Sequence, residues 1–355
     1  MGLRLTFTAR RESSTLRRIL TPILALLVAL MLGGIIIALM GKSPLIAFYV
    51  FLRDPLTDPW AVQEVLLKAT PLSLIAIGLL FCFRANRWNI GAEGQFILGG
   101  VMGGGVAILA HGSEASWVLP AMLVAGALGG MIYAAIPALL RNRFGISEIL
   151  TSLMLVYVAE LLLDYLVRGP WRDPKGYNFP QSVPFSESAT LQPFFDGGRL
   201  HAGVIIALLA IGVAALLFRR SLFGYAVSAS GEAPRAANFA GFNEARITLI
   251  VFLISGALAG LAGIIEVSGQ VGQLRPGFGG GLGFTAIIVA FLGRLNPLGA
   301  ALSALVIAVL LIGAESAQVV MKLPFDLTRF FMGMLLLCVL LGESLNRYEI
   351  KLVRR

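Results

Sequence analysis

The chain has 355 residues, of which 57% are hydrophobic and 13% are charged, and its mean hydropathy is +0.86. Soluble domains have roughly 45–50% apolar and about 25% charged residues, so this composition excludes an ordinary water-soluble fold. The formal net charge of +9 would suit nucleic acid, but a multi-pass membrane protein also collects basic residues in its cytoplasmic loops. The composition therefore indicates a protein embedded in lipid.

A membrane-spanning helix needs about 20 mostly apolar residues. Segments of this kind recur at 19–40, 65–83, 117–140, 147–167, 202–218, 247–266, 298–314 and 327–341. Two weaker candidates are 90–110, which is rich in glycine, and 284–293, which is short. We predict an all-α polytopic membrane protein with about ten transmembrane helices. Its transmembrane domain is 19–341, between a basic N-terminus, 1–18, and a basic C-terminus, 342–355.

The distribution of basic residues predicts the orientation. If the N-terminus is cytoplasmic, most of the 28 Lys and Arg residues fall in cytoplasmic segments. The positive-inside rule then places both termini in the cytoplasm. In this topology 219–246 is a cytoplasmic loop and 168–201 is the longest outer loop. The prolines and aromatic residues of that outer loop indicate an ordered, irregular cap or a docking surface.

The glycine-rich segment 90–110 also contains Glu93 and Gln95, and Asn89 precedes it. A charge at the centre of a spanning helix costs about 2.5–3.5 kcal/mol on insertion scales, so it normally faces a cavity or a partner. Clustered glycines permit non-helical backbone, which a membrane tolerates only where protein buries it or where it lines water. We therefore predict a helix that is broken by its glycines.

A second glycine-rich stretch, EVSGQVGQLRPGFGGGLGF at 266–284, faces the outer side in this topology. Two glycine-broken segments of opposite orientation suggest an inverted repeat, with spans two to five related to spans seven to ten. In transporters such breaks mark the substrate path. The candidate path residues are Asn89, Glu93, Gln95, Gln270, Gln273, Phe278 and Phe284. The alternative is that the glycines only let helices pack closely, as in small-xxx-small contacts.

The cytoplasmic loop contains a short predicted helix, 233–240. Pro234 suits a first helical turn, Glu232 would complement the N-terminal dipole, and Gly241 could end the helix. Its small apolar residues in the cytosol would suit insertion into a groove of another protein. The alternative is a connector that lies on the membrane surface.

No sequence signature of an enzyme accompanies these features. The GKS at 41–43 lacks the glycine five positions earlier that a phosphate-binding loop requires, and it follows an apolar helix instead of a strand. Histidines and cysteines number two each and are far apart. We therefore expect neither catalytic nor metal-binding residues.

Three motifs together resemble a known family. NIGAEGQ at 89–95, GEAPRAANFAGFN at 231–243 and GLGFTAIIVAFLGRLNPLG at 281–299 resemble the permease subunits of bacterial ABC importers. The resemblance is to the branched-chain amino-acid-type permease family, in its nucleoside and simple-sugar branch. Permeases for ribose-like sugars tend to have an Asp-Leu-Ser pattern where this chain has Gly-Ala-Glu-Gly-Gln, which favours the nucleoside side.

The resemblance implies an inner-membrane permease that imports nucleosides or related simple sugars. It has no cofactor of its own, because a separate cytoplasmic ABC ATPase uses the ATP. The other implied partners are a second related permease, more often than a second copy, and a periplasmic or lipoprotein solute-binding protein. The 231–243 segment then corresponds to the helix that couples to the ATPase. The coupling residues are Glu232, Ala233, Arg235, Ala236, Ala237, Ala240 and Gly241.

Two other classes of protein remain open from the residues alone. An ion-coupled secondary transporter would need an ionisable residue deep in the membrane, for which Glu93, Glu160, Asp164 and Glu266 are candidates. A membrane scaffold would show no dependence on a solute.

Overall fold

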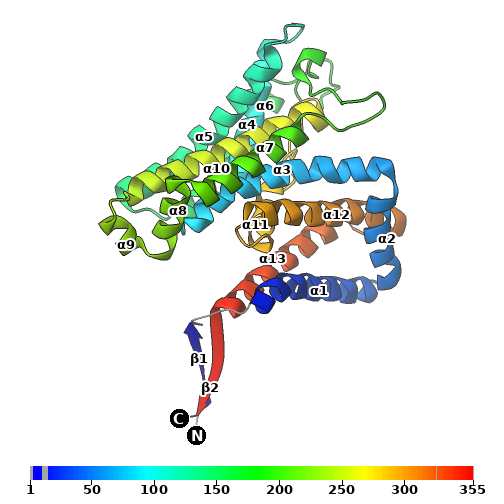
Figure 1. The fold of residues 1–355 in the computed structure, drawn as a ribbon. Helices are drawn as coiled ribbons and strands as arrows, with labels where there is room; N and C mark the ends of the chain where they lie inside the picture. Colours follow the sequence, from blue (N-terminus) through cyan, green and yellow to red (C-terminus); the bar gives the residue numbers. More distant parts are fainter. Residues whose placement is uncertain (1–2, 10–14, 325, 355) are drawn as a thin grey trace. The chain divides into compact units, whose positions relative to one another are not determined.

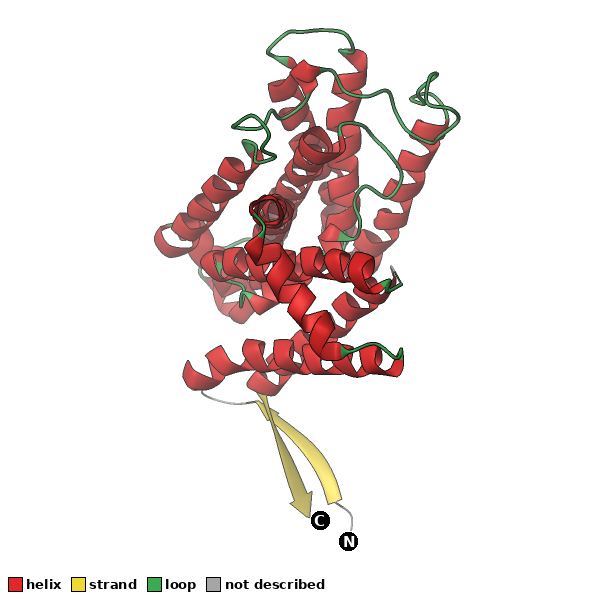
Figure 2. Cartoon of the chain, turned by 90° about the vertical axis from the view of Figure 1, so that its right-hand side faces the viewer, coloured by secondary structure: helices red, strands yellow, loops and turns green. Residues whose placement is uncertain are grey.

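The computed structural model describes residues 3–9, 15–324 and 326–354, and these are almost entirely helical (Figures 1 and 2). Two antiparallel strands, β1 Leu3–Ala9 and β2 Tyr348–Arg354, are also present. The helices are α1 Thr15–Leu39, α2 Pro44–Thr57, α3 Pro59–Arg84, α4 Ala92–Leu109, α5 Val118–Phe144, α6 Glu148–Arg168, α7 Gly203–Arg220, α8 Leu222–Glu232, α9 Pro234–Phe239, α10 Glu244–Glu266, α11 Leu282–Leu292, α12 Pro297–Met321 and α13 Asp326–Arg347. Two single turns, η1 Glu187–Ala189 and the π-helical η2 Val267–Val271, complete the secondary structure of the described residues.

The predicted spans correspond to helices of the structure one by one. Within the described residues, eight helices are long and apolar enough to cross a membrane, and two shorter apolar ones are α11 and part of α13. The prediction of an all-α polytopic membrane protein is confirmed, and ten is an approximate number of spans. Helix α2 was not predicted. It begins at Pro44, and the Ser43 side chain accepts a hydrogen bond from the Ile46 N–H, a typical helix start.

The chain divides into two compact units, each described separately. The first lies within Met1–Ala61 and Val309–Arg355. Within it α1 packs along α13, and α2 contacts α1. The strands pair in register from Leu3 with Arg354 to Ala9 with Tyr348. Residues 3–9 and 348–354, within the two segments predicted as basic tails, therefore form a two-stranded ribbon.

The second unit, Val62–Ala308, is organised around α10, which packs against α4 and α5 (Figure 1). Two glycine pairs with three residues between them face each other, Gly126 and Gly130 on α5 and Gly256 and Gly260 on α10. A Cβ atom added at Gly130 would meet the Gly256 carbonyl oxygen, and one added at Gly260 would meet the Gly126 carbonyl oxygen. These are small-xxx-small contacts, in which backbones approach closely because no side chain separates them.

Connecting segments meet at both ends of this unit. At one end 85–91 contacts the last residues of the 219–246 loop, because Arg87 pairs with Glu244. At the other end the 168–201 loop contacts 267–275, where the Ser182 N–H donates to the Leu274 carbonyl (2.9 Å). By the distribution of basic residues, we refer to these as the predicted inner and predicted outer ends.

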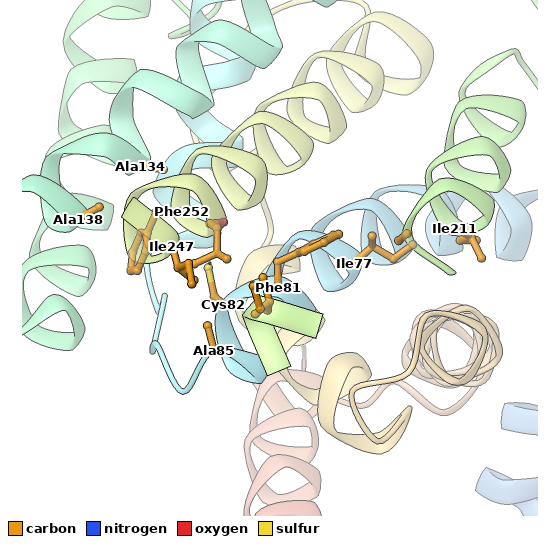
Figure 3. Packing of buried hydrophobic residues seen from close by; sticks show 13 residues of the cluster. Ile77, Phe81, Cys82, Ala85, Ala134, Ala138, Ile211, Ile247 and Phe252 are labelled. Carbon is orange, nitrogen blue, oxygen red and sulfur yellow. Dashed lines mark hydrogen bonds between the residues drawn. The ribbon is translucent and has the colours of Figure 1, made fainter. Parts of the chain in front are cut away.

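An apolar core lies towards the predicted inner end (Figure 3). Phe81 and Cys82 of α3, Ala134 of α5 and Phe252 of α10 are fully or almost fully buried there. Helix α8 contributes Val227, which is also fully buried. The 219–246 loop is therefore part of the packed structure through α8, and α9 is its exposed portion.

Candidate functional site

The most irregular backbone in the second unit lies between α10 and α11. After η2, residues 272–281 form turns without regular helix. Four glycines here have positive φ angles, which residues with side chains rarely adopt: Gly272 (72°), Gly277 (72°), Gly280 (59°) and Gly281 (84°). The second predicted break is therefore present, and glycine is required because the backbone is left-handed at these four points.

Glu93, near the start of α4, binds the backbone where this broken segment becomes α11. Its Oε1 accepts a hydrogen bond from the Gly281 N–H (3.0 Å), and its Oε2 accepts one from the Gly283 N–H (2.6 Å). The first N–H groups of a helix have no partner within that helix, and its N-terminus favours negative charge. The Glu93 side chain therefore caps α11 from a different helix. We call this contact the Glu93 bracket.

The glycines of 90–110 have a different role from the predicted one. Helix α4 is continuous from Ala92 to Leu109, and the irregular backbone lies before it, at 85–91. A Cβ added at Gly100 would meet the Phe278 ring, and one added at Gly104 would meet the Leu274 side chain. The prediction that these glycines break the helix is wrong, because the second glycine-rich segment packs directly on them.

The side-chain amides of Asn89 and Gln95 hydrogen-bond to each other in both directions. The Asn89 Nδ2 donates to the Gln95 Oε1 (2.9 Å) and to the Ser255 Oγ of α10 (3.0 Å). The Asn89 Oδ1 accepts from the Gln95 Nε2 (3.0 Å) and from the Gly91 N–H (3.1 Å). Both side chains are buried. Their polar groups thus fix the 85–91 backbone between α4 and α10.

The other candidate path residues are spread along the broken segment. Gln270 and Phe284 are partly exposed. The Gln273 Nε2 donates to the Gln181 Oε1 of the 168–201 loop (3.1 Å). Phe278 is buried and stacks on Phe96 of α4, with ring centroids 5.5 Å apart. The structure therefore brings Glu93 to the end of this segment and places Gln273 at the predicted outer end.

The 168–201 loop supplies hydrogen-bond donors to carbonyl groups of the broken segment and of η2. Besides the Ser182 bond to Leu274, the Phe185 N–H donates to the Gly272 carbonyl (2.8 Å) and the Leu191 N–H to the Ser268 carbonyl (3.0 Å). Buried backbone polar groups need such partners, above all at membrane depth. The loop is therefore an ordered cap over the break.

His201, at the end of this loop, is 2% exposed, and its ring lies against Gly269 of η2. Its Nδ1 accepts a hydrogen bond from the Gly203 N–H (3.2 Å), whereas its Nε2 is buried without a hydrogen-bond partner among the described residues. Burial, and to a lesser degree the nearby Arg199 guanidinium, lowers the pKa of His201 to about 4. The imidazole is therefore neutral at neutral pH.

Ion pairs join helices and connecting segments at both ends of the unit. At the predicted outer end, Lys68 lies 3.6 Å from Glu266 and Arg199 pairs with Glu64. At the predicted inner end, Arg87 pairs with Glu244 and donates from Nε to the Thr248 Oγ1 (3.0 Å). In the sequence the positive-inside rule is enough to account for Arg87, so its pairing with Glu244 is not predicted. The sequence does contain a signal for this pair. Arg87 stands just before the NIGAEGQ motif that leads into one span, and Glu244 stands where another span begins.

The predicted coupling helix is present as α9. Pro234 occupies its first turn, and Gly241 follows its end with a φ angle of 86°. Glu232, predicted to complement the dipole of this helix, is the last residue of α8, and α9 has no side-chain cap hydrogen bond. Ala236 is exposed, whereas Ala237 is 4% exposed and faces the protein. Of the remaining coupling candidates, Ala233, Arg235 and Ala240 are exposed.

The sequence pattern of one protein family, described as "Branched-chain amino acid transport system / permease component", matches residues 61–340. The chain belongs to this family. The match includes the Glu93 bracket, the broken segment and α9. Membership makes the chain a membrane permease of an ABC transporter, which is a transport component and not itself catalytic. The family implies an ATPase and a solute-binding protein as partners.

Three relatives illustrate the range of the family. The permease is 36% identical to the glucose ABC transporter permease protein TsgB13 of Haloferax volcanii, over 93% of this chain and 89% of the relative. It is 29% identical to the guanosine ABC transporter permease protein NupP of Bacillus subtilis, over 91% and 93%. A second guanosine permease of that organism, NupQ, is 28% identical over 67% of this chain and 76% of the relative. No solved structure matches the permease.

Proposed function

We propose that the permease forms the translocation path of an ATP-driven importer for a neutral, hydroxyl-rich solute, either a glucose-like sugar or a nucleoside. The printed activities of the relatives, glucose and guanosine transport, support this class of solute. Identity is higher to the glucose permease than to the guanosine permeases, so the nucleoside preference suggested by the 89–95 motif is only one of two possibilities.

The observation that supports a path most directly is the broken segment itself. Its backbone is irregular inside a set of apolar helices, yet hydrogen bonds from Glu93 and from the 168–201 loop satisfy it. Irregular backbone at membrane depth is typical of a site that protein surrounds or water fills. Partly exposed Gln270 and Phe284 would offer an amide and an aromatic face to the solute.

The candidate residues then divide into two groups. Gln270, Phe284 and the side-chain oxygen of Gln273 are proposed to contact solute, since the Gln273 Nε2 already donates to Gln181. Asn89, Glu93 and Gln95 use their polar groups within the chain, so we assign them to positioning the break. Phe278, stacked on Phe96, would support the segment from behind.

The partners follow from α9 and from the pair of guanosine permeases in one organism. Phe239 at the end of α9 is 94% exposed, and an exposed aromatic on a short helix suits a groove on the ATPase. Because Bacillus subtilis has both NupP and NupQ, a second related permease is the favoured membrane partner. In this proposal both termini and α9 face the cytoplasm, and the 168–201 loop faces the solute-binding protein at the outer surface of the cytoplasmic membrane.

In this mechanism, ATP binding closes the ATPase dimer and moves α9. Predicted spans two to five and seven to ten then tilt relative to each other, and the broken segment becomes open to one side of the membrane at a time. An ion-coupled transporter is less well supported, because the buried carboxylates are already bound: Glu93 to backbone N–H groups and Glu266 to Lys68.

Uptake in proteoliposomes tests the proposal. The permease is reconstituted with its ATPase, second permease and solute-binding protein, with ATP supplied and ion gradients collapsed. Radiolabelled glucose and guanosine are offered in separate experiments. ATP-dependent accumulation of either solute supports the proposal, and accumulation that requires an ion gradient instead contradicts it.

A further inference from the structure

The ion pair between Arg87 and Glu244 connects two segments that the proposed mechanism needs to move together. Glu244 is the first residue of α10 and lies near the end of the 219–246 loop, which contains α9. Arg87 lies in the 85–91 segment, directly before the helix that bears Glu93. The pair therefore joins the end of the 219–246 loop to the segment that leads into Glu93.

Arg87 is anchored more firmly than a surface ion pair requires. Its side chain is 9% exposed, and its guanidinium also donates to Thr248, one turn along α10 from Glu244. Arg87 therefore holds two successive turns of α10 through two hydrogen bonds of fixed geometry. A displacement of the α10 N-terminus must displace Arg87 or break a partly buried charge-assisted contact.

The 85–91 segment would pass such a displacement to the bracket. Asn89 binds Ser255 of α10 at its Nδ2, and the Ile90 N–H donates to the Ser152 Oγ of α6 (3.2 Å). Three residues after Ile90, Glu93 binds the Gly281 and Gly283 N–H groups. The path from Glu244 to the start of α11 thus consists of hydrogen bonds and a short stretch of backbone.

Helix α8 provides a second, apolar connection to the same segment. Its buried Val227 packs in the core with Phe81 and Ala85 (Figure 3). A Cβ added at Gly231, near the end of α8, would meet the Arg84 carbonyl oxygen. The backbone near the end of α8, in the 219–246 loop, is therefore in direct contact with the backbone at the end of α3.

We propose that Arg87 and Glu244 are positioning residues that transmit movement of the α8–α9 loop to the Glu93 bracket, and so to the broken segment before α11. This inference rests on the proposed ATP-driven import. It assigns the pair no contact with solute and no part in ATP hydrolysis. Loss of the pair should therefore separate hydrolysis from transport.

The test measures solute imported per ATP hydrolysed by the complete reconstituted transporter, with whichever of glucose and guanosine the unaltered transporter accumulates. Arg87→Ala and Glu244→Ala should each lower this ratio by about tenfold, within the usual range of coupling between sites. The charge swap Arg87→Glu with Glu244→Arg should restore the ratio to within about threefold, because it re-forms the pair with opposite polarity. An unchanged ratio in both single variants, or a swap no better than either, would overturn the inference.

Two further variants keep the result interpretable. Glu244→Gln changes a side chain that is 46% exposed, so it should fold even if Arg87→Ala does not, and it should also lower the ratio. Arg168→Ala breaks an ion pair with Asp164 that lies within α6, at the predicted outer end and away from the 85–91 segment. Its ratio should stay unchanged, and an equal fall would overturn the inference. Absence of ATP-driven uptake by the unaltered transporter would instead refute the proposed function.

Discussion

The Glu93 bracket makes a quantitative prediction about stability. Glu93→Ala removes both acceptors from the N–H groups of Gly281 and Gly283, and each buried N–H without a partner costs about 1–3 kcal/mol. Removing the carboxylate also removes its own desolvation cost. We therefore expect a net loss of about 2–4 kcal/mol for Glu93→Ala. Glu93→Gln keeps one acceptor and directs an NH₂ group at the other N–H, so its loss should be about 1–3 kcal/mol.

Thermal unfolding of the detergent-solubilised permease, followed by size-exclusion chromatography after heating, measures this order. The Tm should fall from wild type to Glu93→Gln to Glu93→Ala, by a few degrees for each step, and uptake should fall in the same order. Glu160→Ala is the matched control, because Glu160 is an exposed carboxylate on a spanning helix. A Glu93→Ala variant with the wild-type Tm but no uptake would refute the capping role and assign Glu93 to the solute.

Three other predictions test the packing around the site. Gly283→Ala should prevent stable accumulation, because its Cβ would lie 2.5 Å from the Glu93 Cα, whereas Gly212→Ala, with nothing within 4 Å, should accumulate normally on an immunoblot. Ala236→Glu on the exposed side of α9 should reduce ATPase co-purification without lowering the Tm, whereas Ala237→Glu, at a buried position, should lower the Tm. His201 has a folded pKa of about 4 against an ordinary 6.5, so the unfolded chain binds more protons in this window. Stability should therefore fall as pH drops from 6.5 towards 4, by up to about 1.4 kcal/mol per pH unit, and His201→Gln should flatten that part of a Tm–pH curve.

The sequence predicts the helices well because their apolar length is a local property. Segments such as 65–83 and 147–167 need no knowledge of their neighbours. The same holds for α9, since Pro234 and Gly241 mark a helix start and stop by their own backbone preferences. Helix α2 has equally local signals at Ser43 and Pro44, but its 14 residues are too short for a search based on span length.

The role of a glycine depends on what lies opposite, which the sequence does not state. Gly104 and Gly280 belong to similar clusters, yet one is a packing surface in a continuous helix and the other has a left-handed backbone. The broken segment was correctly located, and the predicted break in 90–110 was wrong, because α4 needs its glycines to receive Leu274 and Phe278. The inverted repeat stays a prediction.

Contacts between residues far apart in the sequence were the hardest feature to predict. The sequence separates Arg87 from Glu244 by 157 positions and Glu93 from Gly283 by 190, so only the fold can bring them together. Glu93 was singled out because a carboxylate among apolar residues is costly. Its partners, the Gly281 and Gly283 N–H groups, were not predicted, because every residue other than proline has a backbone N–H group and the sequence does not distinguish these two.

The 168–201 loop holds the broken segment entirely through main-chain atoms at Ser268 and Gly272, and through main chain and the Ser182 hydroxyl at Leu274. Glu93 likewise binds main-chain N–H groups at the other end of the segment. The partly exposed Gln270 side chain, between these points, takes no part in these main-chain contacts. A family built in this way can exchange such a side chain to accept a different solute while it keeps the same frame.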